Sequence, residues 1–219
     1  YPEINVEEEA MKILKKNFFT ILIWGTVAGF TALYVSLIFN HNIWTDEAFT
    51  LQLLRENVKG IIDGTARDVH PPLYYLYAKI FTVIFGDALL VQKVAAILPM
   101  TATLVLGATL IRREFGDRAA VLFLFFLACI PCSMEFAVQV RMYSLALLFV
   151  TLCGVYAYRA FIYGGRMDFA VYAVSAVAAA YTHYFAFVSV IITAGLLFLA
   201  ILIWKRERAA AWGISAAAM

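Results

Sequence analysis

Six long apolar stretches, separated by shorter polar segments, constrain this chain more than any other feature of its sequence. Runs of about 20 apolar residues match the ~30 Å hydrocarbon thickness of a bilayer. Hydrophobic residues make up 64% of the 219 residues, charged residues only 15%, and the mean hydropathy is +0.84. Because the bilayer core holds no water to satisfy polar groups, this composition predicts an all-α integral membrane protein. The expected spans cover about 18–39, 88–111, 119–134, 142–162, 169–184 and 186–204.

The short apolar stretch 73–85 decides the predicted topology. Its thirteen residues would reach only ~20 Å as a helix, which is short for a span. If it does not cross, every basic cluster lies on one side, and the positive-inside rule makes that side cytoplasmic. We therefore predict a surface helix that begins near Pro71 and ends at Gly86. The clusters are Lys12, Lys15 and Lys16; Arg112, Arg113 and Arg118; Arg159 and Arg166; and Lys205, Arg206 and Arg208.

The first loop, 40–87, is expected on the outer face and holds a second predicted surface helix. Apolar residues recur every three or four positions from Asp46 onward, and Gly60 stands where such a helix would end. The fold predicted is thus a polytopic helical bundle of about six transmembrane helices with two outer juxtamembrane helices. We expect 1–17 to be a cytoplasmic segment, 18–208 the transmembrane module, and 209–219 the start of a further span in a longer protein.

Asp46 and Glu47 open the first surface helix. One interpretation is structural: Asp46 caps the helix and Glu47 interacts with its positive end. The other is chemical, because a carboxylate at the membrane interface beside Trp44 can act as a general base toward a hydroxyl. Asp68 and His70 come later in the same loop, where both would ordinarily be solvated. Tyr74, Tyr75 and Tyr77 follow, and an interfacial aromatic belt is their usual role.

Arg141 is the one basic residue in the short outer turn between the third and fourth expected spans. Its side chain can extend toward lipid phosphates, or it can hold a bound phosphate by two parallel hydrogen bonds. Glu135 is a candidate partner for it. His183 and Tyr184 end the fifth expected span on the same side, so they either share that site or belong to the aromatic belt.

Metal binding and redox chemistry have weaker support. Cys129 and Cys132 have the spacing of a redox or metal pair, but no second ligand pair accompanies them, and all three cysteines lie in apolar runs. Two carboxylates and a His in the first loop could hold a divalent cation through water, although their spacing is not diagnostic. No metal site or cofactor is therefore assigned. The net charge of +2 is small and dispersed, which argues against nucleic-acid binding.

Four motifs, in this order, resemble those of GT-C membrane glycosyltransferases, most closely the protein O-mannosyltransferase and lipid A aminoarabinose transferase group. The resemblance runs from about Phe18 to Trp204. Many members have Glu two residues before the Arg of the third motif, where this chain has Gln139, and members are usually longer. The motifs are Asp46-Glu47, His70-Pro71-Pro72-Leu73-Tyr74-Tyr75, Arg141-Met142-Tyr143-Ser144-Leu145 and Tyr181-Thr182-His183-Tyr184-Phe185.

The resemblance implies an inverting transfer of a sugar from a polyprenyl-phosphate-linked donor to a lipid, glycan or protein hydroxyl. Asp46 would be the base, with Glu47 and Asp68 as further catalytic acids, and Arg141 would bind the donor phosphate. The reaction would take place on the outer face of the plasma membrane of a prokaryote. The other residues that would contact substrate are His70, Tyr74, Gln139, Tyr143, His183 and Tyr184.

Two other classes of protein compete with a transferase. In a transporter or channel, the acidic residues and Arg141 would line a solute path, but such a path should place ionisable residues near the middle of the membrane, where the spans have almost none. A non-catalytic membrane subunit that binds a partner through its surface helices is the third interpretation. The presence of both acids and the Arg argues only weakly against it.

Overall fold

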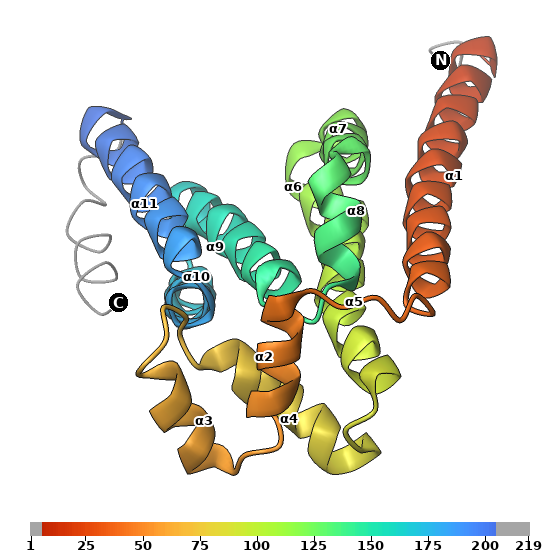
Figure 1. The fold of residues 1–219 in the computed structure, drawn as a ribbon. Helices are drawn as coiled ribbons and strands as arrows, with labels where there is room; N and C mark the ends of the chain where they lie inside the picture. The colour runs from red at the N-terminus through yellow and green to blue at the C-terminus, as the bar shows by residue number, and fades with distance from the viewer. Residues whose placement is uncertain (1–5, 205–219) are drawn as a thin grey trace.

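The computed structural model describes residues 6–204, and these residues form helices joined by short connections (Figure 1). No β-strand occurs within this range. The predicted all-α fold is therefore confirmed. The predicted start of a further span at 209–219 and the basic cluster at Lys205, Arg206 and Arg208 lie outside the described residues. The helices are α1 (Val6–Leu37), α2 (Thr45–Leu53), α3 (Val58–Thr65), α4 (Leu73–Phe85), α5 (Leu89–Leu106), α6 (Arg112–Phe115), α7 (Asp117–Cys129), α8 (Pro131–Val138), α9 (Tyr143–Tyr163), α10 (Arg166–Thr182) and α11 (Tyr184–Trp204), with a π-helical turn (Gly107–Ile111) between α5 and α6.

Four helical segments are long and apolar enough to cross a membrane: Asn17–Leu37, Leu89–Phe115, Tyr143–Tyr163 and Tyr184–Trp204. The chain thus has the helices of an integral membrane protein. A fifth crossing is obtained if α7 and α8 count as one broken span. The fifth expected span, 169–184, corresponds to α10, which has only 17 residues and is not among these segments. The count of about six therefore stays a prediction.

The expected span at 119–134 is broken in the structure, because α7 and α8 meet at an angle of 72°. Pro131 is the first residue of α8 and has no N–H to donate to the preceding turn. Proline also disfavours the α conformation in the residue before it, and Ile130 is extended, with φ −73° and ψ 116°. The bend directs α8 toward the turn that carries Arg141.

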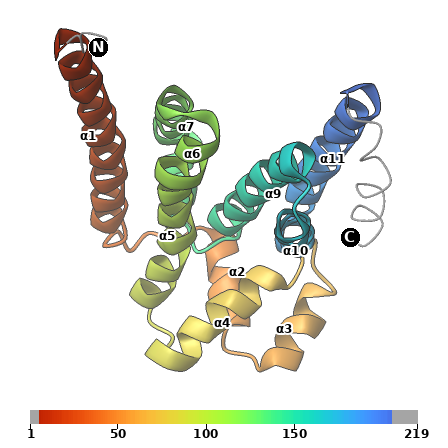
Figure 2. The ribbon, with the colours of Figure 1, turned by 180° about the vertical axis from the view of Figure 1, so that it is seen from behind.

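The first loop contains three helices rather than the two expected, and Figures 1 and 2 show all three gathered at one end of the longer helices. The predicted helix from Asp46 to Gly60 is interrupted after Leu54. Asn57 starts α3, because its Oδ1 accepts a hydrogen bond from the Gly60 N–H at 2.8 Å. The predicted helix at 73–85 is confirmed as α4, which ends at Gly86, where φ is +91°.

The buried core lies in separate clusters that match this layout. One cluster joins α1, α5, α7 and α8, and a second joins α9, α10 and α11. A third cluster attaches the outer helices to the start of α9, because Leu54, Ile61, Tyr74 and Tyr75 pack with Met142. The outer helices are thus fixed to the bundle at the turn before α9.

At the other end of the long helices, charged side chains join α6, α9 and α10. Glu114 forms an ion pair with Arg159, and Arg159 Nε donates to Asp168 at 2.7 Å. Arg112 pairs with Asp117 at 2.6 Å. Two of the basic clusters predicted to be cytoplasmic are therefore adjacent in the structure. The assignment of this end to the cytoplasm stays a prediction.

Candidate functional site

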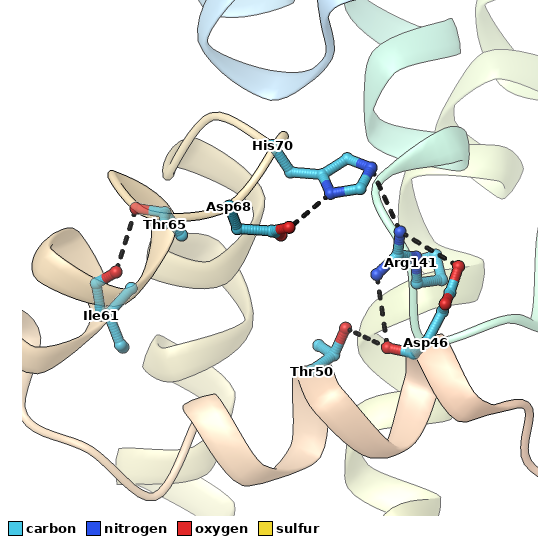
Figure 3. A network of polar contacts seen from close by, with 7 residues as sticks. All are labelled: Asp46, Thr50, Ile61, Thr65, Asp68, His70 and Arg141. Atoms are coloured by element: carbon cyan, nitrogen blue, oxygen red, sulfur yellow. Dashed lines mark hydrogen bonds and ion pairs between the residues drawn. The ribbon is translucent and has the colours of Figure 1, made fainter.

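A polar network forms where the first turn of α2, the connection between α3 and α4, and the turn before α9 meet (Figure 3). It joins Asp46, Asp68, His70 and Arg141, which are separated by up to 95 residues in the sequence. All four were predicted as site residues from the sequence. The structure brings their side chains together.

Arg141 is the centre of this network, and its side chain is only 3% exposed. Nη1 donates to the Asp46 carbonyl oxygen at 3.3 Å, and Nη2 lies 3.5 Å from the Asp46 carboxylate. Nη2 also lies 3.3 Å from His70 Nε2. The buried Nε has no hydrogen-bond partner among the described residues. A buried guanidinium normally uses its donors, so the Nε–H of Arg141 is an exception that an anion could satisfy.

The contact with Arg141 determines the tautomer of His70. Arginine can only donate, so His70 Nε2 must accept, and the proton of the neutral ring is then on Nδ1. His70 Nδ1 lies 3.0 Å from Asp68 Oδ2 and donates to it. Asp68 thereby orients the imidazole, which in turn supports the guanidinium of Arg141.

Asp68 remains ionised in this arrangement. Partial burial acts to raise the pKa of its carboxyl group. The hydrogen bonds from His70 and the Val69 N–H and the positive charge of Arg141 outweigh that effect, so the pKa lies below its usual value. The carboxylate therefore contributes negative charge beside Arg141.

Asp46 and Glu47 differ in their surroundings although they are adjacent. The Asp46 side chain is 67% exposed and lies beside Arg141, so an external molecule can reach its carboxylate. Asp46 does not cap α2, because the residue before the helix is Trp44. The interpretation of Asp46 as the helix cap is thus wrong.

Glu47 is only 2% exposed, and backbone N–H groups occupy both of its oxygens. Its Oε2 accepts from Trp44 N at 2.9 Å, which satisfies the first backbone donor of α2. Its Oε1 accepts from Val140 N at 2.8 Å, a contact across 93 residues. Glu47 thus connects the start of α2 to the turn that carries Arg141, a role that the sequence did not indicate.

Aromatic residues cover the network on the side of α10 and α11. The ring of His183 lies 5.9 Å from that of His70 and 5.8 Å from that of Tyr143, measured between centroids. His183 Nδ1 accepts a hydrogen bond from the Phe185 N–H at 3.1 Å. Burial, followed by the positive charge of Arg141, lowers the pKa of His183, which favours the neutral form of this ring.

The other residues predicted to contact substrate or Arg141 lie outside the polar network. Tyr184 is 57% exposed, whereas Tyr74 is only 1% exposed and lies in the core. Gln139 donates to Glu135 at 3.2 Å. The expected pairing of Glu135 with Arg141 is not what the structure has, because Arg141 pairs with Asp46.

Two connected grooves lead away from the polar network. The first, of about 380 Å³, is lined by His70, Pro71, Pro72, Tyr181 and Tyr184 together with residues of α3 and α11. The second, of about 640 Å³, lies between α4 and α10 and has an almost wholly apolar lining, including Leu73, Leu76 and Val177. Pro72 and Tyr181 line both. An elongated apolar molecule could therefore extend from His70 along α4.

Metal binding has no geometric support within residues 6–204, where no three His, Cys, Asp or Glu side chains converge as ligands. Comparison of the chain with models of known protein families, with curated proteins and with solved structures finds no match. The assignment of a function therefore depends on the geometry of the site and on the sequence motifs.

Proposed function

We propose that this chain is the membrane module of an inverting glycosyltransferase of the GT-C type that uses a polyprenyl-phosphate-linked sugar. The observation that carries the proposal is a buried Arg141 with a spare donor, 3.5 Å from the exposed carboxylate of Asp46, beside an apolar groove. A lipid phosphate needs a cation, and its isoprenoid chain needs an apolar channel. A hydroxyl nucleophile needs a base. The three requirements are met within one region.

In the proposed reaction, the acceptor oxygen forms a bond to the anomeric carbon as the bond from that carbon to the phosphate oxygen breaks. Asp46 takes the hydroxyl proton, and the electron pair leaves with the polyprenyl phosphate. Arg141 stabilises the charge that develops on this phosphate, and His70 and Asp68 orient Arg141. A single in-line displacement inverts the anomeric centre.

The proposed location is the outer face of the plasma membrane of a prokaryote. Nucleotide sugars are not expected outside the cytoplasm, so a transferase there needs a donor that is carried by the membrane. The separation of the site from the Arg159 cluster by the length of the long helices supports this orientation (Figure 1).

A transporter has less support than a transferase. Among the side chains that the structure describes, the buried charged ones are Glu47, Lys93, Glu114, Arg141 and Asp168, and each lies in a loop or near the end of a helical segment. A path for ions or polar solutes should have such groups near the middle of its spans.

The test compares Asp46→Asn with Asp87→Asn, which removes an exposed acid elsewhere in the outer loop. The complete protein is incubated with a series of polyprenyl-phosphate sugars, and released polyprenyl phosphate is measured by mass spectrometry. Asp46→Asn should lower turnover by roughly 10² or more, because Asn cannot take the proton. Asp87→Asn should retain turnover. Near-normal release by Asp46→Asn would remove Asp46 as the base, and no release by the unmodified protein with any donor would remove the proposed function.

A further inference from the structure

α3 separates two grooves of opposite character. On one side, Ile62, Thr65 and Ala66 line the groove shared with α11. On the other side, Gly60, Asp63, Gly64 and Arg67 line a groove shared with α2. The first groove is apolar and is assigned above to the isoprenoid chain. The second has charged and polar side chains in its lining.

The groove between α2 and α3 has a volume of about 300 Å³ and charged walls. Gln52 and Glu56 line it from the α2 side, Asp63 lines it from α3, and Arg67 lines it from the connection after α3. Two glycines allow the close approach of these segments. A Cβ at Gly64 would lie 2.7 Å from Leu53 Cδ1, and one at Gly60 would lie 2.9 Å from Glu56 Cβ.

Phe49, in the lining of this groove, lies about one turn along α2 from the proposed base. Asp46, Phe49 and Gln52 follow one another at three-residue spacing, so each neighbours the next on a row that turns by about 120° around the helix. The distance from Asp46 to Gln52 along the helix axis is about 9 Å. On the opposite wall, Arg67 immediately precedes Asp68, which belongs to the polar network.

The lining has the chemistry that binds sugar hydroxyl groups. Carboxylates accept hydrogen bonds, guanidinium groups donate them, and the Gln52 amide does both. The ring of Phe49, which is 39% exposed, offers an apolar surface to the C–H face of a pyranose. An isoprenoid or acyl chain would leave these charges desolvated, which is costly.

From this geometry we propose that the α2–α3 groove is the acceptor subsite and that the acceptor is a glycan. The inference rests on the proposed function and adds the substrate class. One sugar unit places its reacting hydroxyl at Asp46, and the next units occupy the groove toward Gln52 and Asp63.

The experiment measures binding and transfer separately in the complete protein. Saturation-transfer NMR with mannotriose, maltotriose and chitotriose as probes compares the unmodified protein, Asp63→Ala and Lys59→Ala. Lys59 is an exposed α3 residue that does not line the groove, so it serves as the control. At least one trisaccharide should bind to the unmodified protein and to Lys59→Ala. Asp63→Ala should raise its dissociation constant, and the KM for it as acceptor, by about tenfold.

Release of polyprenyl phosphate in the absence of any acceptor distinguishes the two proposals. If the unmodified protein hydrolyses the donor but binds no trisaccharide, the acceptor inference is overturned while the proposed function stands. Equal trisaccharide affinity in Asp63→Ala and the unmodified protein would also overturn it, as would transfer to a serine-containing peptide or a lipid alone. A protein that binds a trisaccharide at this groove but cleaves no donor would retain the glycan site and lose the transferase.

Discussion

The guanidinium of Arg141 holds its donors in a fixed planar fork, which suits a phosphate better than the point charge of a lysine would. Its Nη atoms are in contact with Asp46 and His70, and its buried Nε has no partner among the described residues. A lysine at this position keeps the charge but cannot hold two partners in one plane while donating to a third. The shape of the group is thus as important as its charge.

We therefore expect Arg141→Lys to raise the KM for the lipid-linked donor by about tenfold or more, with a smaller effect on the KM for the acceptor. Steady-state kinetics in which donor and acceptor are varied separately measure both values. Arg55→Lys is the matched control, because Arg55 is an exposed arginine of the outer loop that pairs with Asp87 at 3.7 Å. An unchanged KM for the donor in Arg141→Lys would exclude Arg141 from the phosphate site.

Glu47 shows how a buried carboxylate can act through geometry alone. Its two oxygens accept from Trp44 N and Val140 N, so both segments that carry the reacting groups are connected through one side chain. Glutamine offers one acceptor oxygen, and its NH2 group would face the other backbone N–H.

Glu47→Gln should therefore lower the free energy of unfolding by about 1–3 kcal/mol, the cost of one buried donor left without a partner. Thermal unfolding in detergent measures the loss. Glu56→Gln, at an exposed glutamate of the same loop, should unfold like the unmodified protein. If Glu47→Gln retains full stability while turnover falls, Glu47 has a chemical role instead.

At the scale of elements, the break between α2 and α3 produces the two grooves beside α3, which a continuous helix would not have. The separate α3 has one side toward each groove, and its start depends on Asn57, whose side chain holds the Gly60 N–H. Asn57→Ala should cost about 1 kcal/mol of stability. Asn57→Asp, which keeps an acceptor, should cost much less, and thermal unfolding of both variants decides the matter. Equal stability of Asn57→Ala and the unmodified protein would show that α3 does not need its cap.

Elements whose bounds depend on neighbouring residues can be predicted from the sequence. Contacts between residues far apart in the sequence cannot. The bounds of α4 depend on Pro72 and Gly86, which are local signals, and the prediction of 73–85 matches the structure. The break at Asn57 was missed, because apolar spacing continues across it while a single side-chain hydrogen bond interrupts the helix. The sequence predicted that Asp46, His70 and Arg141 lie on the same face of the membrane. It did not predict the contacts between them. The contact of Glu47 with Val140 spans 93 residues and has no local signal.

At the scale of the whole molecule, α9 and α10 connect the two polar regions. Tyr143 at the start of α9 lies near His183, which follows α10, and both belong to the site. At the other end, Arg159 of α9 pairs with Asp168 of α10 and with Glu114. α10 thus returns along the path of α9 although its 17 residues reach only about 26 Å. We predict from this packing that α10 crosses, which together with a broken α7–α8 span would give six crossings.

Cysteine labelling from each side of the membrane tests that count. The turn glycines Gly86, Gly116 and Gly164 have positive φ, so the labels belong on their exposed neighbours. In a background without the native cysteines, Arg118→Cys and Met167→Cys should react only from the cytoplasmic side. Asp87→Cys and Tyr184→Cys should react only from outside, because α5 and α10 then each cross once. Reaction of Met167→Cys and Tyr184→Cys from the same side would show that α10 does not cross, and the basic clusters beyond it would no longer share one face.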